Sequence, residues 1–118
     1  MKNLLLLPIL LSCVSPSLAM PRMSYEDMQL MKSIISVGIA KCNYLQGYIS
    51  KEKTAKKLRT DLRKRLSHRK YMSHINYVNS YEGKGFVKDV ISSLYSDCVD
   101  LDDIKFQKFY KKFALRNK

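Results

Sequence analysis

The stretch SYEDMQLMKSIISVGIAKCNYLQG, residues 24–47, decides the fold that we predict for this 118-residue chain. Its apolar residues recur every three or four positions, as they do on one face of an α-helix. This stripe comprises Met28, Met31, Ile35, Gly38, Cys42 and Leu45. Leu30, Ile34 and Val37 widen the stripe to more than half of the helix surface, so we expect other elements to cover this helix from two sides.

Residues at both ends of the stretch predict where the helix begins and ends. Ser24 is of a residue type that caps helix N-termini, and Glu26 and Asp27 follow in the first turn, where the helix dipole favours negative charge. Gly47 is a natural stop, because glycine readily adopts the left-handed conformation that ends many helices. We therefore expect the first helix to span residues 24–46.

The following segment, residues 51–70, predicts a second helix that packs on one side only. Ser50 is its expected N-cap, and Glu52 lies in the first turn. Its apolar residues form a narrow stripe of Ala55, Leu58, Leu62 and Leu66. Most of the surface of this helix is therefore expected to face water.

A second apolar repeat follows, formed by Tyr71, Ile75 and Val78. At about 100° per residue this repeat points nearly opposite to the leucine stripe, so one straight helix cannot bury both on the same side. We expect a break within residues 67–73, followed by a short irregular or helical piece that ends at the glycines of residues 83–85.

The remaining chain predicts two more helices, at residues 85–98 and 101–116. The first carries a compact stripe of Val87, Val90, Ile91, Leu94 and Cys98. The second begins with aspartates that suit an N-cap and a first turn, and one face of it carries Phe106, Phe109, Tyr110 and Phe113. The predicted fold class is all-α: a small bundle of about four helices, at residues 24–46, 51–70, 85–98 and 101–116.

The N-terminus, residues 1–19, has the pattern of a signal peptide. A short positive start precedes an apolar run, and the segment closes on a small-x-small sequence that ends at Ala19. We therefore expect a single helical domain, residues 20–118, that is exported and is periplasmic or secreted. An alternative is a lipoprotein anchored through Cys13, because the sequence Leu-Leu-Ser-Cys resembles a bacterial lipidation motif.

The exported domain has two cysteines, Cys42 and Cys98, and these predict a disulfide. An even cysteine count in an oxidising compartment is typical of disulfide-bonded proteins. Both residues are expected on buried faces near the C-terminal ends of their helices. If the first three helices run up, down and up, those two ends lie together. The predicted disulfide therefore links the first and third helices of the bundle covalently.

Positive charge is concentrated in one part of the chain. The formal net charge is +12, and between residues 50 and 74 ten Lys or Arg face only Glu52 and Asp61. The candidate binding residues are Lys53, Lys56, Lys57, Arg59, Arg63, Lys64, Arg65, Arg69 and Lys70. Such a surface favours binding of an acidic protein or a polyanion without catalysis, although a solvated helix face has the same composition.

A different class of function uses the last helix. Its aromatic face, Phe106, Phe109, Tyr110 and Phe113, could lie on an anionic membrane together with the basic helix. The pattern favours the other interpretation, in which these aromatics close the core of a small bundle. Neither reading implies a small-molecule substrate, and the oligomeric state is left open.

The sequence offers no catalytic, cofactor or metal motif. His68 and His74 are six residues apart, which does not put two imidazoles on one helix face. The aspartates that follow Asp97 lack the glycine and glutamate of a calcium loop. We therefore predict no cofactor and no metal, and an enzyme with a site around His74 and Glu82 is the weakest alternative.

Overall fold

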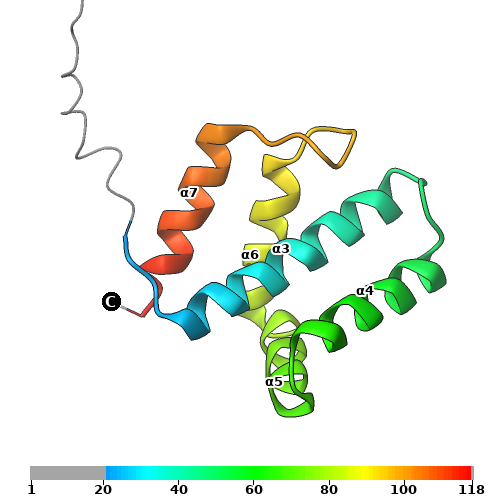
Figure 1. The fold of residues 1–118 in the computed structure, drawn as a ribbon. Helices are drawn as coiled ribbons and strands as arrows, with labels where there is room; N and C mark the ends of the chain where they lie inside the picture. Colours follow the sequence, from blue (N-terminus) through cyan, green and yellow to red (C-terminus); the bar gives the residue numbers. More distant parts are fainter. Residues whose placement is uncertain (1–20, 118) are drawn as a thin grey trace, which may run out of the picture.

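The structure is a computed structural model, and it describes residues 21–117. The described chain is all-α, as predicted, and contains five helices where the sequence indicated about four (Figure 1). They are α3 (Tyr25–Leu45), α4 (Lys51–Arg65), α5 (His68–Val78), α6 (Tyr81–Ser93) and α7 (Asp103–Ala114). The predicted signal peptide and Cys13 lie outside the described residues.

Helix α3 crosses the middle of the molecule, with α4 on one side and α6 on the other (Figure 1). The Ser24 hydroxyl accepts a hydrogen bond from the Asp27 N–H at 3.1 Å, which confirms the predicted N-cap. At the other end, Gly47 has φ +79°. The N–H of Tyr48 bonds the carbonyl of Asn43 at 2.9 Å, the six-to-one bond of a glycine-terminated helix.

The main core lies where α3, α6 and α7 meet. Ile34, Val90 and Phe113 have no exposed surface, and Phe109 is 2% exposed. The close approach of α3 and α6 depends on Gly38, because a Cβ atom there would lie 2.5 Å from Cγ1 of Val90. The broad apolar face of α3 is thus covered from two sides, as the sequence predicted. Two residues of the predicted stripe lie outside this contact, since Met28 is 41% exposed and Leu45 is 65% exposed.

The expected break after the second helix is confirmed, but the boundaries differ. Helix α4 ends at Arg65 and not at residue 70, because Leu66 is extended and the Ser67 hydroxyl accepts from the Lys70 N–H to cap α5. The piece that follows is a full helix of 11 residues. The break lets Leu66 and Tyr71 lie in one cluster, which two opposed stripes on a straight helix could not do.

The predicted third helix, residues 85–98, is shifted toward the N-terminus. Helix α6 begins at Tyr81 because the Ser80 hydroxyl caps it, accepting from the Gly83 N–H at 3.1 Å. The glycines that were expected to end the preceding piece therefore lie inside α6. The helix ends at Ser93, so the expectation that Cys98 lies on a helix is wrong.

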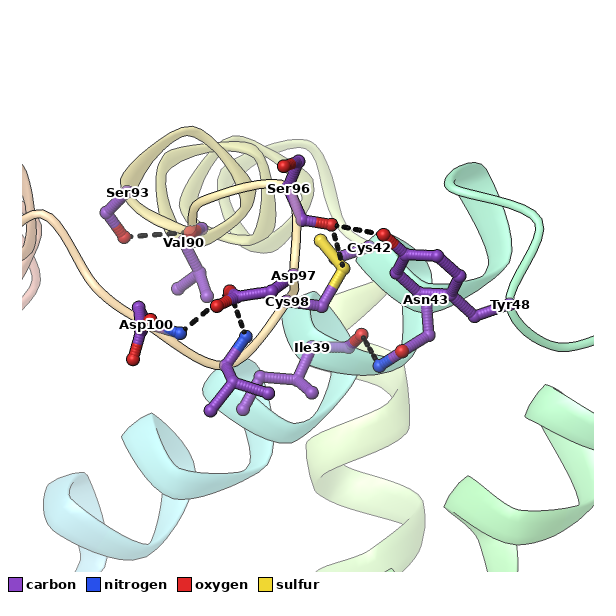
Figure 2. Close-up of a disulfide and its surroundings, with 11 residues drawn as sticks. Ile39, Cys42, Asn43, Tyr48, Val90, Ser93, Ser96, Asp97, Cys98 and Asp100 are labelled. Atoms are coloured by element: carbon purple, nitrogen blue, oxygen red, sulfur yellow. Dashed lines mark hydrogen bonds between the residues drawn. A yellow bond between two sulfur atoms is a disulfide. The ribbon is translucent and has the colours of Figure 1, made fainter.

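Cys98 instead lies in the loop between α6 and α7, with φ +59° (Figure 2). Bonds from the Tyr95 N–H to the Asp100 carbonyl and from the Asp102 N–H to the Ser93 carbonyl close this loop on itself. The predicted Cys42–Cys98 disulfide is present, with a Cα–Cα distance of 5.7 Å. It joins the C-terminal end of α3 to the loop after α6, and not two helix ends.

The C-terminal end of α7 returns to the start of α3. Arg116 pairs with Asp27 at 2.8 Å, and the Tyr110 hydroxyl donates to the Pro21 carbonyl at 3.4 Å. The Asp102 carboxylate caps α7 by accepting from the Lys105 N–H, as predicted for this group of aspartates. Within residues 21–117, no helix has the length and apolar character needed to cross a membrane.

Candidate binding surface

Helix α4 packs through one narrow side. Leu62 is its only buried residue and has no exposed surface. It forms a small cluster with Leu66 and Tyr71, and Leu58 connects this cluster to the main core. The other sides of the helix face water, so its sequence is not constrained there by packing.

The cations of α4 gather on the side that faces away from the core. At about 100° per residue, Lys53, Lys57 and Lys64 lie within about 40° of the direction opposite Leu62. Lys56 and Arg63 flank them on one side. We call these five residues, all exposed, the α4 outward face. It extends about 16 Å along the helix axis from Lys53 to Lys64, at 1.5 Å per residue.

Among the described residues, no carboxylate forms an ion pair with the α4 outward face, although Glu52 and Asp61 lie one turn from Lys56 and Lys57. The ion pairs within residues 21–117 join Lys112 to Asp89 at 3.2 Å and Arg116 to Asp27 at 2.8 Å, and neither involves α4. Lysines at i and i+4, such as Lys53 and Lys57, repel each other by about 0.2–0.5 kcal/mol in a helix. The arrangement therefore opposes helix stability slightly.

The remaining predicted cations lie elsewhere. Arg59 lies on the side of α4 nearer the packed leucines, and Arg65 belongs to its last turn. Arg69 and Lys70 occupy the first turn of α5, where the helix dipole disfavours positive charge. Lys70 lies 5.8 Å from the centre of the Tyr25 ring. The structure thus divides the nine candidates into the five residues of the outward face, three at the corner between α4 and α5, and Arg59 on the packed side of α4.

One contact joins the α4 outward face to α5. The Arg63 guanidinium lies 4.7 Å from the centre of the Tyr71 ring, and Tyr71 is 8% exposed. Such a cation–π contact holds the arginine against the protein and leaves part of its charge accessible. Arg63 is therefore the cation of the outward face whose position is best defined.

A groove of about 390 Å³ lies between α3 and α4, beside the α4 outward face. Ile39, Tyr48 and Leu58 contribute apolar surface to it, and Lys57 and Asp61 contribute charge. Lys57 thus belongs both to the groove and to the outward face. The Tyr48 hydroxyl donates to the Ser96 carbonyl at 2.9 Å, so this ring is fixed against the disulfide loop (Figure 2).

His74 has a partner that the sequence did not reveal. Its Nδ1 lies 2.7 Å from the Ser33 hydroxyl of α3, and both residues are buried. Burial, and then the charges of Arg65 and Lys70, lower the pKa of His74 below 6.5. Ser33 has no exposed surface, so a substrate cannot reach its oxygen. A serine inside the apolar stripe of the first helix was the one available signal for this buried pair.

The neighbourhood of His74 contains a further polar group. Burial, and then the carboxylate of Glu82, raise the pKa of Tyr77 to about 12. The hydroxyl of Tyr77 is buried and has no hydrogen-bond partner among the described residues. A hollow of about 260 Å³ nearby is lined by Asp27, Lys70 and His74 among others. Asp27 is already paired with Arg116, so these groups do not converge on one point.

The aromatic face of the last helix lies mainly inside the protein. Phe109 and Phe113 are buried, and Phe106 and Tyr110 are partly buried against the same core. The Phe86 ring meets the Phe113 ring edge to face, with centroids 5.2 Å apart. These aromatics close the bundle, which was the favoured interpretation of the pattern.

Sequence reasoning missed a second cationic surface, between α6 and α7. We call it the α6–α7 trough; its lysines are Lys84, Lys88, Lys105, Lys108 and Lys112. The i, i+4 spacing in α6 and the i, i+3, i+7 spacing in α7 were visible in the sequence. Only the packing of the two helices shows that these two short series line adjoining hollows, which share Lys112.

Within residues 21–117, no group of three or more His, Cys, Asp or Glu side chains could hold a metal ion. The Asp97 carboxylate accepts hydrogen bonds from the N–H groups of Val99 and Asp100, which hold its pKa below the ordinary value.

The chain was compared with known protein families, curated proteins and solved structures. No family model, no curated protein and no solved structure matches this chain.

Proposed function

We propose that this protein binds a linear polyanion through the α4 outward face, without catalysis. The observation that carries the proposal is five exposed cations on one side of a helix with no carboxylate paired to them. Binding a polyanion would relieve their mutual repulsion and release condensed counterions, which makes the affinity depend strongly on salt. A helix whose cations serve only to keep the protein in solution would not show such binding.

The chemistry of the surface indicates how the polyanion would be recognised. Four of the five residues are lysines, which act as mobile point charges and not as rigid two-pronged donors. Arg63 is the exception, and it is held by Tyr71. No exposed aromatic residue lies among the cations of α4 to stack on a base. We therefore propose recognition of closely spaced phosphate or sulfate groups along a chain, independent of its sequence.

The proposed location is outside the cytoplasm. The disulfide is consistent with an extracellular protein, since such bonds persist in oxidising compartments. The N-terminal pattern of residues 1–19 supports export by a signal peptide. Anionic polysaccharides and released nucleic acid both offer the required chemistry in that setting.

The test replaces Lys53, Lys56 and Lys64 with Gln and measures binding to heparin and to duplex DNA over a range of salt concentrations. We expect the slope of log affinity against log salt for duplex DNA bound at the α4 outward face to fall by about three, since each lost phosphate contact removes about 0.9. The matched control replaces three exposed lysines outside both cationic surfaces, Lys32, Lys41 and Lys111, with Gln. Equal losses in both variants would mean that net charge, and not the α4 outward face, governs binding.

A second candidate, action on an anionic membrane, draws on a different observation. Large apolar side chains are exposed in and beside the disulfide loop: Tyr48 is 60% exposed, Val99 76% and Ile104 70%. Such residues could enter a lipid surface to which the basic helix is attracted. Binding to phosphatidylglycerol vesicles that persists at high salt would favour this candidate, whereas purely electrostatic binding is lost as salt rises.

A further inference from the structure

The α6–α7 trough is a hollow surface and not a convex helix face. Two adjoining hollows, of about 320 and about 590 Å³, share the residues Asp89 and Lys112. The first extends toward Ser92 and Lys105, and the second toward Tyr81 and Lys84. The two hollows adjoin at the Asp89–Lys112 ion pair and between them follow the length of α6.

Positive charge dominates the trough. Its five lysines face two carboxylates, Glu82 and Asp89. Asp89 is paired with Lys112 at 3.2 Å, and the ammonium group of Lys112 lies 5.9 Å from the centre of the Phe86 ring. All five lysines are exposed. The trough therefore offers several cations, from two helices, to one elongated anionic ligand.

The trough and the α4 outward face point away from each other. On α6, Lys84 and Lys88 lie within about 60° of the direction opposite Val90, and Val90 packs against Gly38 of α3. The α4 outward face is likewise opposite Leu62 and the packed side of α4. Helix α3 lies between α4 and α6 (Figure 1). The α6 lysines of the trough and the α4 outward face therefore lie on opposite sides of α3.

This placement restricts how a polyanion can use both surfaces. Duplex DNA has a persistence length of about 150 base pairs, so a duplex of about 15 base pairs is a rigid rod. Such a rod cannot bend around α3 to reach both sides of so small a domain. Two rods, one on each surface, can be held at the same time.

We propose that the α6–α7 trough is a second polyanion-binding site and that the protein bridges two polyanion chains. The α4 half of this bridge rests on the proposed function, whereas the trough half rests on its own geometry. A monomer with two such sites cross-links chains when chains and protein are at similar concentration. An excess of protein separates the bridged pairs again, because each chain then occupies a protein molecule of its own.

The experiment mixes donor-labelled and acceptor-labelled duplexes of about 15 base pairs, too stiff to wrap the domain. Energy transfer between the labels reports bridging, and the anisotropy of one label reports binding. Labelled heparin fragments replace the duplexes in a second arm, which separates a preference for sulfate groups from one for phosphate groups. The variants carry Gln at Lys88, Lys105 and Lys108, or at Lys53, Lys56 and Lys64, with the Lys32, Lys41 and Lys111 variant as control.

We expect the native protein and the control variant to bridge, with a maximum at intermediate protein concentration. Each surface variant should keep single-chain binding within about tenfold and lose most of the energy transfer, because three phosphate contacts are removed from one site only. Undiminished transfer in the trough variant would overturn the second site, including the case in which dimers bridge through two α4 faces. Native binding of one chain without transfer would overturn bridging and leave the proposed function intact. Absence of any binding would overturn both proposals.

Discussion

Helices α4 and α7 have similar sequences in outline and opposite roles in the fold. Both are short, both are rich in lysine, and both carry a stripe of apolar residues. Helix α7 buries Phe109 and Phe113 in the main core, whereas α4 buries Leu62 alone, in a side cluster. The difference shows that a helix stabilises the fold in proportion to the apolar surface that it buries. Most of the surface of α4 is not needed for packing and is therefore free to bind a partner.

The first test of the difference in stability between the two helices removes one large side chain from each. Phe113→Ala should cost about 3–5 kcal/mol of unfolding free energy and Leu62→Ala about 2–3 kcal/mol, because the aromatic leaves the larger cavity. Phe113 also lies beneath the Arg116 guanidinium, 4.1 Å from the ring centre. Urea unfolding followed by circular dichroism measures both losses.

Hydrogen exchange sharpens the same test, because it reports where each variant opens. Leu62→Ala should raise exchange mainly in α4, residues 51–65, and leave the α3–α6–α7 core protected. Phe113→Ala should raise exchange throughout the described chain. If Leu62→Ala opened the whole domain, α4 would be as integral to the core as α7, and the contrast between the two helices would fail.

The disulfide provides the second test, since it ties the loop before α7 to the end of α3. The bond closes a separation of 56 residues, and its removal should cost about 2–4 kcal/mol in the chain-entropy account. In the double variant Cys42→Ala, Cys98→Ala, we expect protection from hydrogen exchange to fall more in residues 94–114 than in residues 51–65. Native mass spectrometry after alkylation without reductant is the companion measurement, and two labelled thiols would show that the bond does not form.

The smallest expected effect concerns His74, which joins α5 to α3 through Ser33. Its pKa is lowered in the folded protein, so the unfolded chain binds the proton more tightly. The contribution of His74 is therefore fully present above pH 6.5, the ordinary value for the group, and is lost as the pH falls through the lowered folded value. Urea unfolding from about pH 8 to about pH 5, the range in which histidine titrates, measures this loss.

The control for this measurement lies in the same helix. His68 is exposed at the start of α5, so His68→Gln should keep the dependence of unfolding free energy on pH. His74→Gln should remove much of it. If the unfolding free energy of His74→Gln depended on pH as much as that of the native protein, other groups, and not this buried imidazole, would link stability to pH.

Much of the fold was predictable because local signals and packing agreed. The caps at Ser24 and Ser50 and the stop at Gly47 act within a few residues, and a sequence displays them directly. The break near Ser67 was predictable for a similar reason, since two stripes pointing in opposite directions exclude one straight helix. The boundary error at α6 came from reading Gly83 as a stop, although Ser80 caps a helix that includes it.

The candidate surfaces show where such reasoning ends. The α4 outward face could be derived from one helix, because its five cations share a single short segment. The trough could not, because its lysines lie on two helices separated by the disulfide loop. The Ser33–His74 pair was not predicted for the same reason, because the two residues are 41 apart in sequence.

By itself the sequence determined the helices, their caps, the cysteine pair and the segment that carries most of the positive charge. These properties depend on periodicity and on contacts between near neighbours along the chain. Only the tertiary structure decided that Cys98 lies in a loop, that Ser33 meets His74, and that α3 separates two outward-facing cationic surfaces. Such relations depend on how helices cross, and helix crossing is set by long-range packing such as the contact of Gly38 with Val90.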